Sequence, residues 1–150
     1  MIIEVNNILE MNAFGKRLAK LLHGGEVIEL VGDVGSGKTT LTKAIALELG
    51  AQEEVQSPSF TISRIYPVRD GLRLVHYDFY RLHDAGIMKQ ELDEVFRDQT
   101  TITVVEWGDI VSDVLPPDRL TLTIVPPSEV TRRIIVEASG PKSRKIEKAL

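Results

Sequence analysis

Residues 32–39 read Gly32-Asp33-Val34-Gly35-Ser36-Gly37-Lys38-Thr39, and they directly follow the apolar run Val27-Ile28-Glu29-Leu30-Val31. The stretch fits G-x-x-x-x-G-K-[ST] at every fixed position. The apolar run predicts a buried strand, and residues 38–49, closed by Gly50, predict a helix. A glycine-rich turn between a strand and a helix can wrap its backbone N–H groups around phosphate oxygens. The sequence therefore predicts a phosphate-binding loop (P-loop).

Backbone and side chains of this loop are expected to hold a nucleotide together. Lys38 is expected to reach the β- and γ-phosphates, and the Thr39 hydroxyl to bind Mg²⁺. A dinucleotide-binding motif is excluded because the position that would need its third glycine is Thr40. The candidate nucleotide-binding residues of the loop are Asp33, Val34, Gly35, Ser36, Gly37, Lys38, Thr39 and Thr40.

Outside the loop, predicted helices and strands alternate. The expected helices cover residues 8–22, 88–98 and 142–149, and the expected strands cover 60–68, 72–79, 101–106, 119–125 and 130–138. Arg69-Asp70-Gly71 predicts a hairpin between the strands on either side of it. The pattern favours one domain over residues 1–150 with a three-layer α/β P-loop NTPase fold, whose mixed, mainly parallel sheet is flanked by helices.

Composition narrows the class of protein. The chain has 150 residues and no cysteine, so disulfide scaffolds, thiol nucleophiles and cysteine-based metal clusters are excluded. No apolar run approaches the ~20 residues that cross a bilayer, and the start lacks a basic-then-apolar signal, so we expect a cytoplasmic protein without membrane association. The net charge of −4 argues against a general nucleic-acid coat. Residues 131–150 nevertheless hold six Lys or Arg against two Glu. This basic end permits a local contact with phosphate or an acidic partner.

Two carboxylates end apolar segments. Asp78 closes residues 74–78 and Glu106 closes residues 102–106. Each could be a solvated strand end, but beside a P-loop each becomes a candidate for binding the metal, its water shell or the attacking water. Trp107, the only tryptophan, is either a core or rim aromatic or a wall or partner contact of the site. No Asn-Lys-x-Asp guanine reader is present, which favours ATP over GTP.

Four segments, taken in order, resemble the TsaE family of small bacterial P-loop ATPases, formerly called YjeE. They are Gly32 to Thr40, Ser57-Pro58-Ser59-Phe60-Thr61, His76-Tyr77-Asp78-Phe79-Tyr80-Arg81-Leu82 and Val105-Glu106-Trp107. The similarity covers most of residues 8–137 and is weakest at 84–100. It implies an ATPase, slow alone, that supports N6-threonylcarbamoyladenosine formation in tRNA. Its implied partners are the TsaD and TsaB proteins, with tRNA contacted indirectly through that complex.

The resemblance also implies a role for individual residues. Lys38 would bind phosphate, and Thr39 and Glu106 would ligate Mg²⁺. Asp78 would be the Walker B-type acid that holds a metal-bound water or the attacking water. With Lys38, the two carboxylates form the expected catalytic set, and Asp78 also stays a candidate metal ligand because the sequence leaves open which acid binds the metal directly.

More distant segments complete the expected site. Ser59 and Thr61 lie in a switch-like segment and would face the γ-phosphate, unless the segment is only a loop entering a strand. Arg132 matches an arginine that the family places near the nucleotide, unless it is a solvated charge at a strand start.

Two other functions fit a small P-loop protein. A small-molecule kinase would need an acceptor pocket and an arginine-bearing lid, yet Arg97 is the only arginine between Asp84 and Thr100. A nucleotide-gated adaptor would bind ATP without turning it over. The segment 142–150 is expected to be a basic helix or tail, either solvated and frayed or in contact with tRNA.

Overall fold

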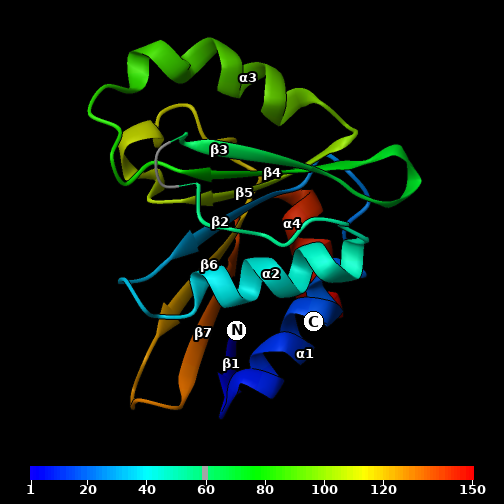
Figure 1. The fold of residues 1–150 in the computed structure, drawn as a ribbon, viewed down its shortest axis with the longest axis vertical. Coiled ribbons are helices and arrows are strands. Elements are labelled where there is room, and N and C mark those ends of the chain that lie inside the picture. The colour runs from blue at the N-terminus through cyan, green and yellow to red at the C-terminus, as the bar shows by residue number, and fades with distance from the viewer. Residues whose placement is uncertain (59–60) are drawn as a thin grey trace.

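The computed structural model describes residues 1–58 and 61–150. It contains one seven-stranded sheet in the order β1-β7-β6-β2-β5-β4-β3 (Figure 1). β6, β2, β5 and β4 are parallel neighbours, whereas β1, β7 and β3 pair antiparallel at the two sides. The strands are β1 Ile2–Val5, β2 Val27–Val31, β3 Ser63–Pro67, β4 Arg73–Asp78, β5 Thr101–Glu106, β6 Leu120–Val125 and β7 Arg132–Ala138. The mixed, mainly parallel sheet confirms the predicted fold class.

Helices cover both faces of the sheet and make three layers (Figure 1). The helices are α1 Ile8–Ala19, α2 Lys38–Leu49, α3 Lys89–Arg97 and α4 Pro141–Ala149. Strand alternation divides the core: Ile102 and Val104 pack with the buried residues of α1, α2 and α4, while Val105 packs with Leu92 of α3. On β4 the same alternation turns Leu74, and with it His76 and Asp78, toward the α2 face.

The hairpin signal at residues 69–71 is confirmed. Asp70 and Gly71 have φ values of 60° and 72°, and β3 and β4 pair antiparallel on either side of them. Two φ values above zero are what a tight hairpin turn requires, and Asp and Gly adopt them at low cost.

The main differences from the sequence-based expectations are two element boundaries and one unpredicted strand. The first helix ends at Ala19 rather than residue 22, because Leu21 and Leu22 continue in short turns whose N–H groups bond to Leu18 and Ala19. The strand expected from residue 60 begins at Ser63, after Ile62 with φ 67°. A β-branched residue in that region cannot continue a strand. β1 was not predicted, because a four-residue edge strand is defined by pairing with β7, a distant partner.

The topology brings the expected functional segments to one edge. Leu30 near the end of β2 pairs with Glu106 of β5, which in turn pairs with Asp78 of β4. The P-loop follows β2, so the two carboxylates lie on the strands next to it. Carboxyl ends of parallel strands form the usual ligand edge of such sheets.

Candidate nucleotide-binding site

The P-loop presents unsatisfied backbone donors. The N–H groups of Gly35, Gly37, Lys38 and Thr39 have no hydrogen-bond acceptor among residues 1–58 and 61–150. Gly35 and Gly37 have φ values of 83° and 113°, which L side chains rarely adopt. α2 begins at Lys38 with no side-chain cap. A helix start with free N–H groups and the positive end of the helix dipole favours an anion.

The backbone at Gly32 has no room for a side chain. A Cβ there would lie 2.6 Å from Ser36 Oγ and 3.0 Å from the Ile124 carbonyl oxygen. Ser36 is buried, and its hydroxyl has no hydrogen-bond partner in the described residues. The loop is therefore packed tightly at its base, while its N–H groups stay free.

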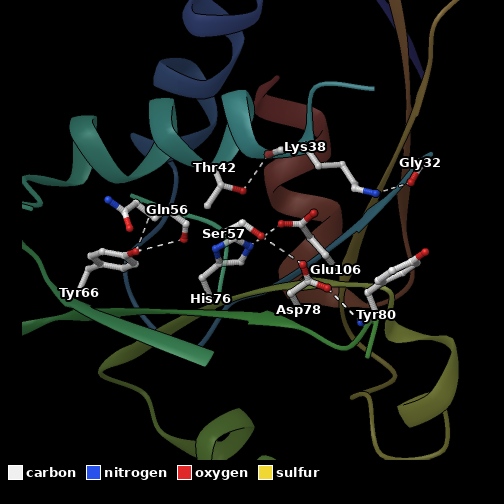
Figure 2. Close-up of polar contacts among 10 residues, drawn as sticks. All are labelled: Gly32, Lys38, Thr42, Gln56, Ser57, Tyr66, His76, Asp78, Tyr80 and Glu106. Atoms are coloured by element: carbon white, nitrogen blue, oxygen red, sulfur yellow. Dashed lines mark hydrogen bonds and ion pairs between the residues drawn. The ribbon is translucent and has the colours of Figure 1, made fainter. Parts of the chain in front are cut away.

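Lys38 lies folded back inside its own loop. Its side chain is buried, and its Nζ donates to the Gly32 carbonyl (Figure 2). The same ammonium lies 4.3 Å from the ring centroid of Trp107. Trp107 has φ 56°, a strained conformation that costs on the order of 1 kcal/mol or more in a residue other than glycine. The Trp107 ring lines the cavity beside Lys38, and its centroid lies 4.9 Å from that of the Tyr80 ring.

The two candidate carboxylates lie on the same edge but in different surroundings (Figure 2). Glu106 is only 3% exposed, and its Oε2 lies 2.5 Å from His76 Nε2. Asp78 is half-buried; its Oδ1 accepts the Tyr80 N–H at 3.0 Å and its Oδ2 accepts the Ser57 hydroxyl at 3.4 Å. Together they supply carboxylate oxygens beside Lys38 and Thr39.

His76 acts on Glu106 from inside the core. Its ring is fully buried, and its Nδ1 has no partner among the residues described. An N–H at Nε2 would donate its hydrogen bond to the Glu106 carboxylate. Sequence reasoning missed the contact between His76 and Glu106, because the two residues are 30 positions apart and lie on different strands.

Arg132 reaches the loop from the start of β7. Its Nε donates to the Ser36 carbonyl at 2.8 Å, and its Nη2 lies 3.3 Å from the Gly35 carbonyl. The same guanidinium bonds to the Ser128 carbonyl at 3.1 Å. It is thus a brace between the β6–β7 turn and the P-loop, and not a solvated charge.

Two cavities adjoin the loop and share Gly35, Gly37 and Thr40. The first, of about 360 Å³, contains the polar groups of Lys38, Thr39, Ser57, Asp78, Arg81 and Glu106 and the rings of Tyr80 and Trp107. The second, of about 570 Å³, is lined by Asn7, Ile8, Leu9, Met11, Glu129, Val130 and Arg132. Sequence reasoning missed Ile8, Leu9 and Val130, since they come from the start of α1 and from the β6–β7 turn and match no motif.

The remaining predicted residues divide into three cases. Asp33 and Val34 lie exposed at the tip of the loop, where Val34 also lines the cavity of about 360 Å³. Thr61 donates its hydroxyl to the Ser63 carbonyl at 3.0 Å and is not among the described residues that line the two cavities. Ser59 lies outside the described residues.

The donor set fits Mg²⁺. Thr39 offers a hydroxyl, and Asp78 and Glu106 offer carboxylates, which are the hard oxygen ligands that Mg²⁺ prefers. Across the described ranges, no group of three or more His, Cys, Asp and Glu forms a ready-made metal cage. Magnesium bound with nucleotide does not need one, because phosphates and waters complete its shell around one or two carboxylates.

Comparisons with known proteins agree with this geometry. The family model described as threonylcarbamoyl adenosine biosynthesis protein TsaE matches residues 5–134. A tRNA threonylcarbamoyladenosine biosynthesis protein TsaE from Streptomyces coelicolor is 43% identical over 115 residues, covering 76% of this chain and 78% of that protein. One from Bacillus subtilis is 39% identical over 132 residues, covering 87% and 81%.

A solved structure shares the fold as well. The crystal structure of Bacillus subtilis YdiB superposes with a TM-score of 0.80 at 34% sequence identity, and the match covers 99% of this chain and 93% of that one. Among the described helices, none has the length and apolar character needed to cross a membrane.

Proposed function

This chain belongs to the TsaE family, and from that premise we propose that it is a Mg²⁺-dependent ATPase that supports tRNA N6-threonylcarbamoyladenosine formation. The observation that carries the proposal is the convergence of unpaired N–H groups, one lysine and two carboxylates on one edge of the sheet. Each part is suited to a different portion of a nucleoside triphosphate. Hydrolysis by the isolated protein would be slow and would depend on its partners.

The P-loop would bind the phosphates. The N–H groups of Gly35, Gly37, Lys38 and Thr39 would donate to phosphate oxygens, which the start of α2 also attracts. The Lys38 ammonium would leave the Gly32 carbonyl and the Trp107 ring for the β- and γ-phosphates. Both present contacts are neutral, so a polyanion is the stronger partner.

The metal would be held between the loop and the strand ends. Thr39 and Glu106 are the proposed direct ligands, and Asp78 would hold a metal-bound water or the attacking water. Bound magnesium would neutralise charge that develops on the phosphates during hydrolysis. His76 would keep one oxygen of Glu106 occupied and leave the other toward the metal. Ser57 would orient Asp78 in the same way.

The apolar cavity would receive the base. It adjoins Thr40 beside the loop, and Ile8, Leu9 and Val130 give it an apolar lining that suits a purine face. The sequence contains no Asn-Lys-x-Asp motif of the kind that recognises guanine, so we propose adenine as the base. Arg132 would hold the P-loop against this cavity.

The proposed partners are TsaD and TsaB, with tRNA reached through their complex. We propose a cytoplasmic location to match this role in tRNA modification. ATP turnover here would support the cycle of that assembly and would not transfer a phosphoryl group to a metabolite.

Phosphate release from ATP tests the proposal. We expect Mg²⁺-dependent release without any added acceptor, slow for the isolated chain and faster with TsaD and TsaB present. Stoichiometric transfer to a small molecule would instead identify a kinase. Tight ATP binding without turnover under every combination would identify a nucleotide-gated adaptor.

A further inference from the structure

The C-terminal helix α4 concentrates positive charge away from the P-loop. α4 contains Lys142, Arg144, Lys145 and Lys148 against one acid, Glu147. All four cations are exposed, and none forms an ion pair within residues 1–58 and 61–150. The rest of the chain is acidic: residues 131–150 carry +4, and the chain as a whole carries −4.

α4 is anchored as a rigid platform. Asp118 accepts hydrogen bonds from the N–H groups of Lys142 at 2.8 Å and Ser143 at 3.0 Å, and from the Ser143 hydroxyl at 2.7 Å. Ile146 is buried in the same core as α1 and α2. A frayed, solvated tail would show neither the capping nor the burial.

The anchoring gives the helix two distinct sides. Ser143 and Ile146 face the body of the protein. At 100° per residue, Arg144, Lys145 and Lys148 then point to solvent together. We call these three residues the basic face. Lys142 lies at its edge, with its Nζ 3.3 Å from the Gly24 carbonyl.

We propose that the basic face is a contact surface for the phosphate backbone of RNA. This inference rests on the proposed function, because a tRNA-modification protein works beside RNA. None of the large apolar side chains that the described residues expose lies on α4. Protein interfaces are built around aromatic and apolar anchors and are depleted in lysine, so an acidic protein is the poorer match. Phosphates need only cations, and without aromatic or amide side chains to read bases the contact is independent of sequence.

The basic face and the P-loop lie at opposite ends of β2. Lys142 contacts Gly24, which precedes β2, whereas the P-loop follows it (Figure 1). Five strand residues separate them by roughly 17 Å. RNA on α4 would therefore leave the nucleotide site open, and the two ligands would bind together.

Binding of fluorescently labelled unmodified tRNA to the full chain, followed by anisotropy at 50–200 mM salt, tests the proposal. Three phosphate contacts predict a slope of about −2 to −3 for log K against log salt concentration. The triple variant Arg144→Gln, Lys145→Gln, Lys148→Gln should bind at least tenfold more weakly with a slope near zero. Glutamine keeps helix propensity, so circular dichroism should show α4 intact.

The matched control removes the same charge elsewhere. Lys43→Gln, Lys89→Gln, Arg97→Gln neutralises three exposed cations on α2 and α3, and it should retain the wild-type affinity and slope. Equal weakening by both triple variants would overturn the proposal, as would no tRNA binding at 50 mM salt. Displacement by polyglutamate but not by tRNA would identify an acidic protein partner and overturn it too.

ATP binding separates this proposal from the one on which it rests. The basic-face variant should bind ATP as the wild type does. A wild-type chain that binds ATP but not tRNA would refute the RNA contact alone. A chain that binds no ATP would refute the proposed ATPase function, whatever the tRNA result.

Discussion

Carboxylates lie at both the amino edge and the carboxyl edge of the parallel strands, but their surroundings differ. At the amino edge, Glu26, Asp98 and Asp118 each precede a parallel strand, and each accepts two or more hydrogen bonds from nearby donors. Glu26 accepts the N–H groups of His23 and Gly24 at 2.9 and 2.7 Å. Asp98 accepts the N–H and hydroxyl of Thr100 at 2.9 and 2.7 Å.

At the carboxyl edge the carboxylates accept fewer or longer hydrogen bonds. The buried Glu106 carboxylate has His76 as its one hydrogen-bond partner in the described residues, and the Asp78 carboxylate accepts one bond at 3.0 Å and one at 3.4 Å. Four P-loop N–H groups are also unpaired there. A buried or half-buried polar group left unpaired costs stability, so the native state tolerates such groups mainly where a ligand completes them. The amino edge therefore stabilises the fold, and the carboxyl edge is built to bind.

The largest expected effect comes from Lys38→Ala. Loss of charge-assisted contacts to two phosphates, about 3 kcal/mol, should weaken ATP binding about 100-fold. Calorimetric titration with Mg·ATP measures this, and thermal unfolding should show a shift of no more than a few degrees. Unchanged affinity would contradict the assignment of the loop.

The next effect concerns the metal. Glu106→Gln keeps a partner for His76 but loses the charge, so the Mg²⁺ concentration at half-maximal ATP binding should rise roughly 10- to 100-fold. Asp78→Asn should mainly reduce turnover. If Asp78→Asn alone changed the Mg²⁺ requirement, the roles of the two residues would be exchanged.

His76→Leu should act through Glu106. We expect the Mg²⁺ requirement to rise about tenfold, as typical of a lost partner behind a metal ligand. His76→Gln, whose amide can donate in place of Nε2, should restore most of the difference. A Leu variant with the wild-type Mg²⁺ requirement would refute the positioning role.

Asp118→Ala probes the amino edge. Loss of the cap on α4 should lower the free energy of unfolding by about 1 kcal/mol. Chemical denaturation measures the loss, and ATP affinity should be unchanged. A weakened ATP affinity without loss of stability would break the contrast between the edges.

The smallest expected effect is on the free energy of unfolding at acidic pH. Hydrogen bonds from the N–H and hydroxyl of Thr100 lower the pKa of Asp98 to about 2. Because the pKa is depressed in the folded state, this contribution is full above the unfolded value near 4 and is lost as the pH falls from about 4 to 2. Asp98→Asn should flatten the pH dependence of unfolding in that window only. An unchanged pH dependence of unfolding in this window would refute the contribution of Asp98.

The sequence predicted what is local or follows from strand order. The P-loop was predictable because its conformation depends on glycines and a helix start within eight consecutive residues. Asp78 and Glu106 were predictable as neighbours because carboxyl ends of parallel strands meet at one edge. Helix α4 was predicted, but its capping by Asp118 was not, because the two are separated by more than 20 positions.

Features of the site that depend on tertiary contacts could not be predicted from the sequence. The lining of the apolar cavity includes Ile8 and Val130, which are distant in sequence and match no motif. The pairing of His76 with Glu106 depends on the facing positions of two strands. The family resemblance predicted Arg132 as a site residue. The residues next to Arg132 in sequence did not predict which carbonyl groups its guanidinium would bond.

A crystal structure with Mg²⁺ and a non-hydrolysable ATP analogue tests the central claim most directly. We predict phosphate oxygens within hydrogen-bond distance of the N–H groups of Gly35, Gly37, Lys38 and Thr39, with the Lys38 ammonium moved from Gly32 to the phosphates. An analogue bound elsewhere, with Lys38 still on the Gly32 carbonyl and the Trp107 ring, would contradict the account.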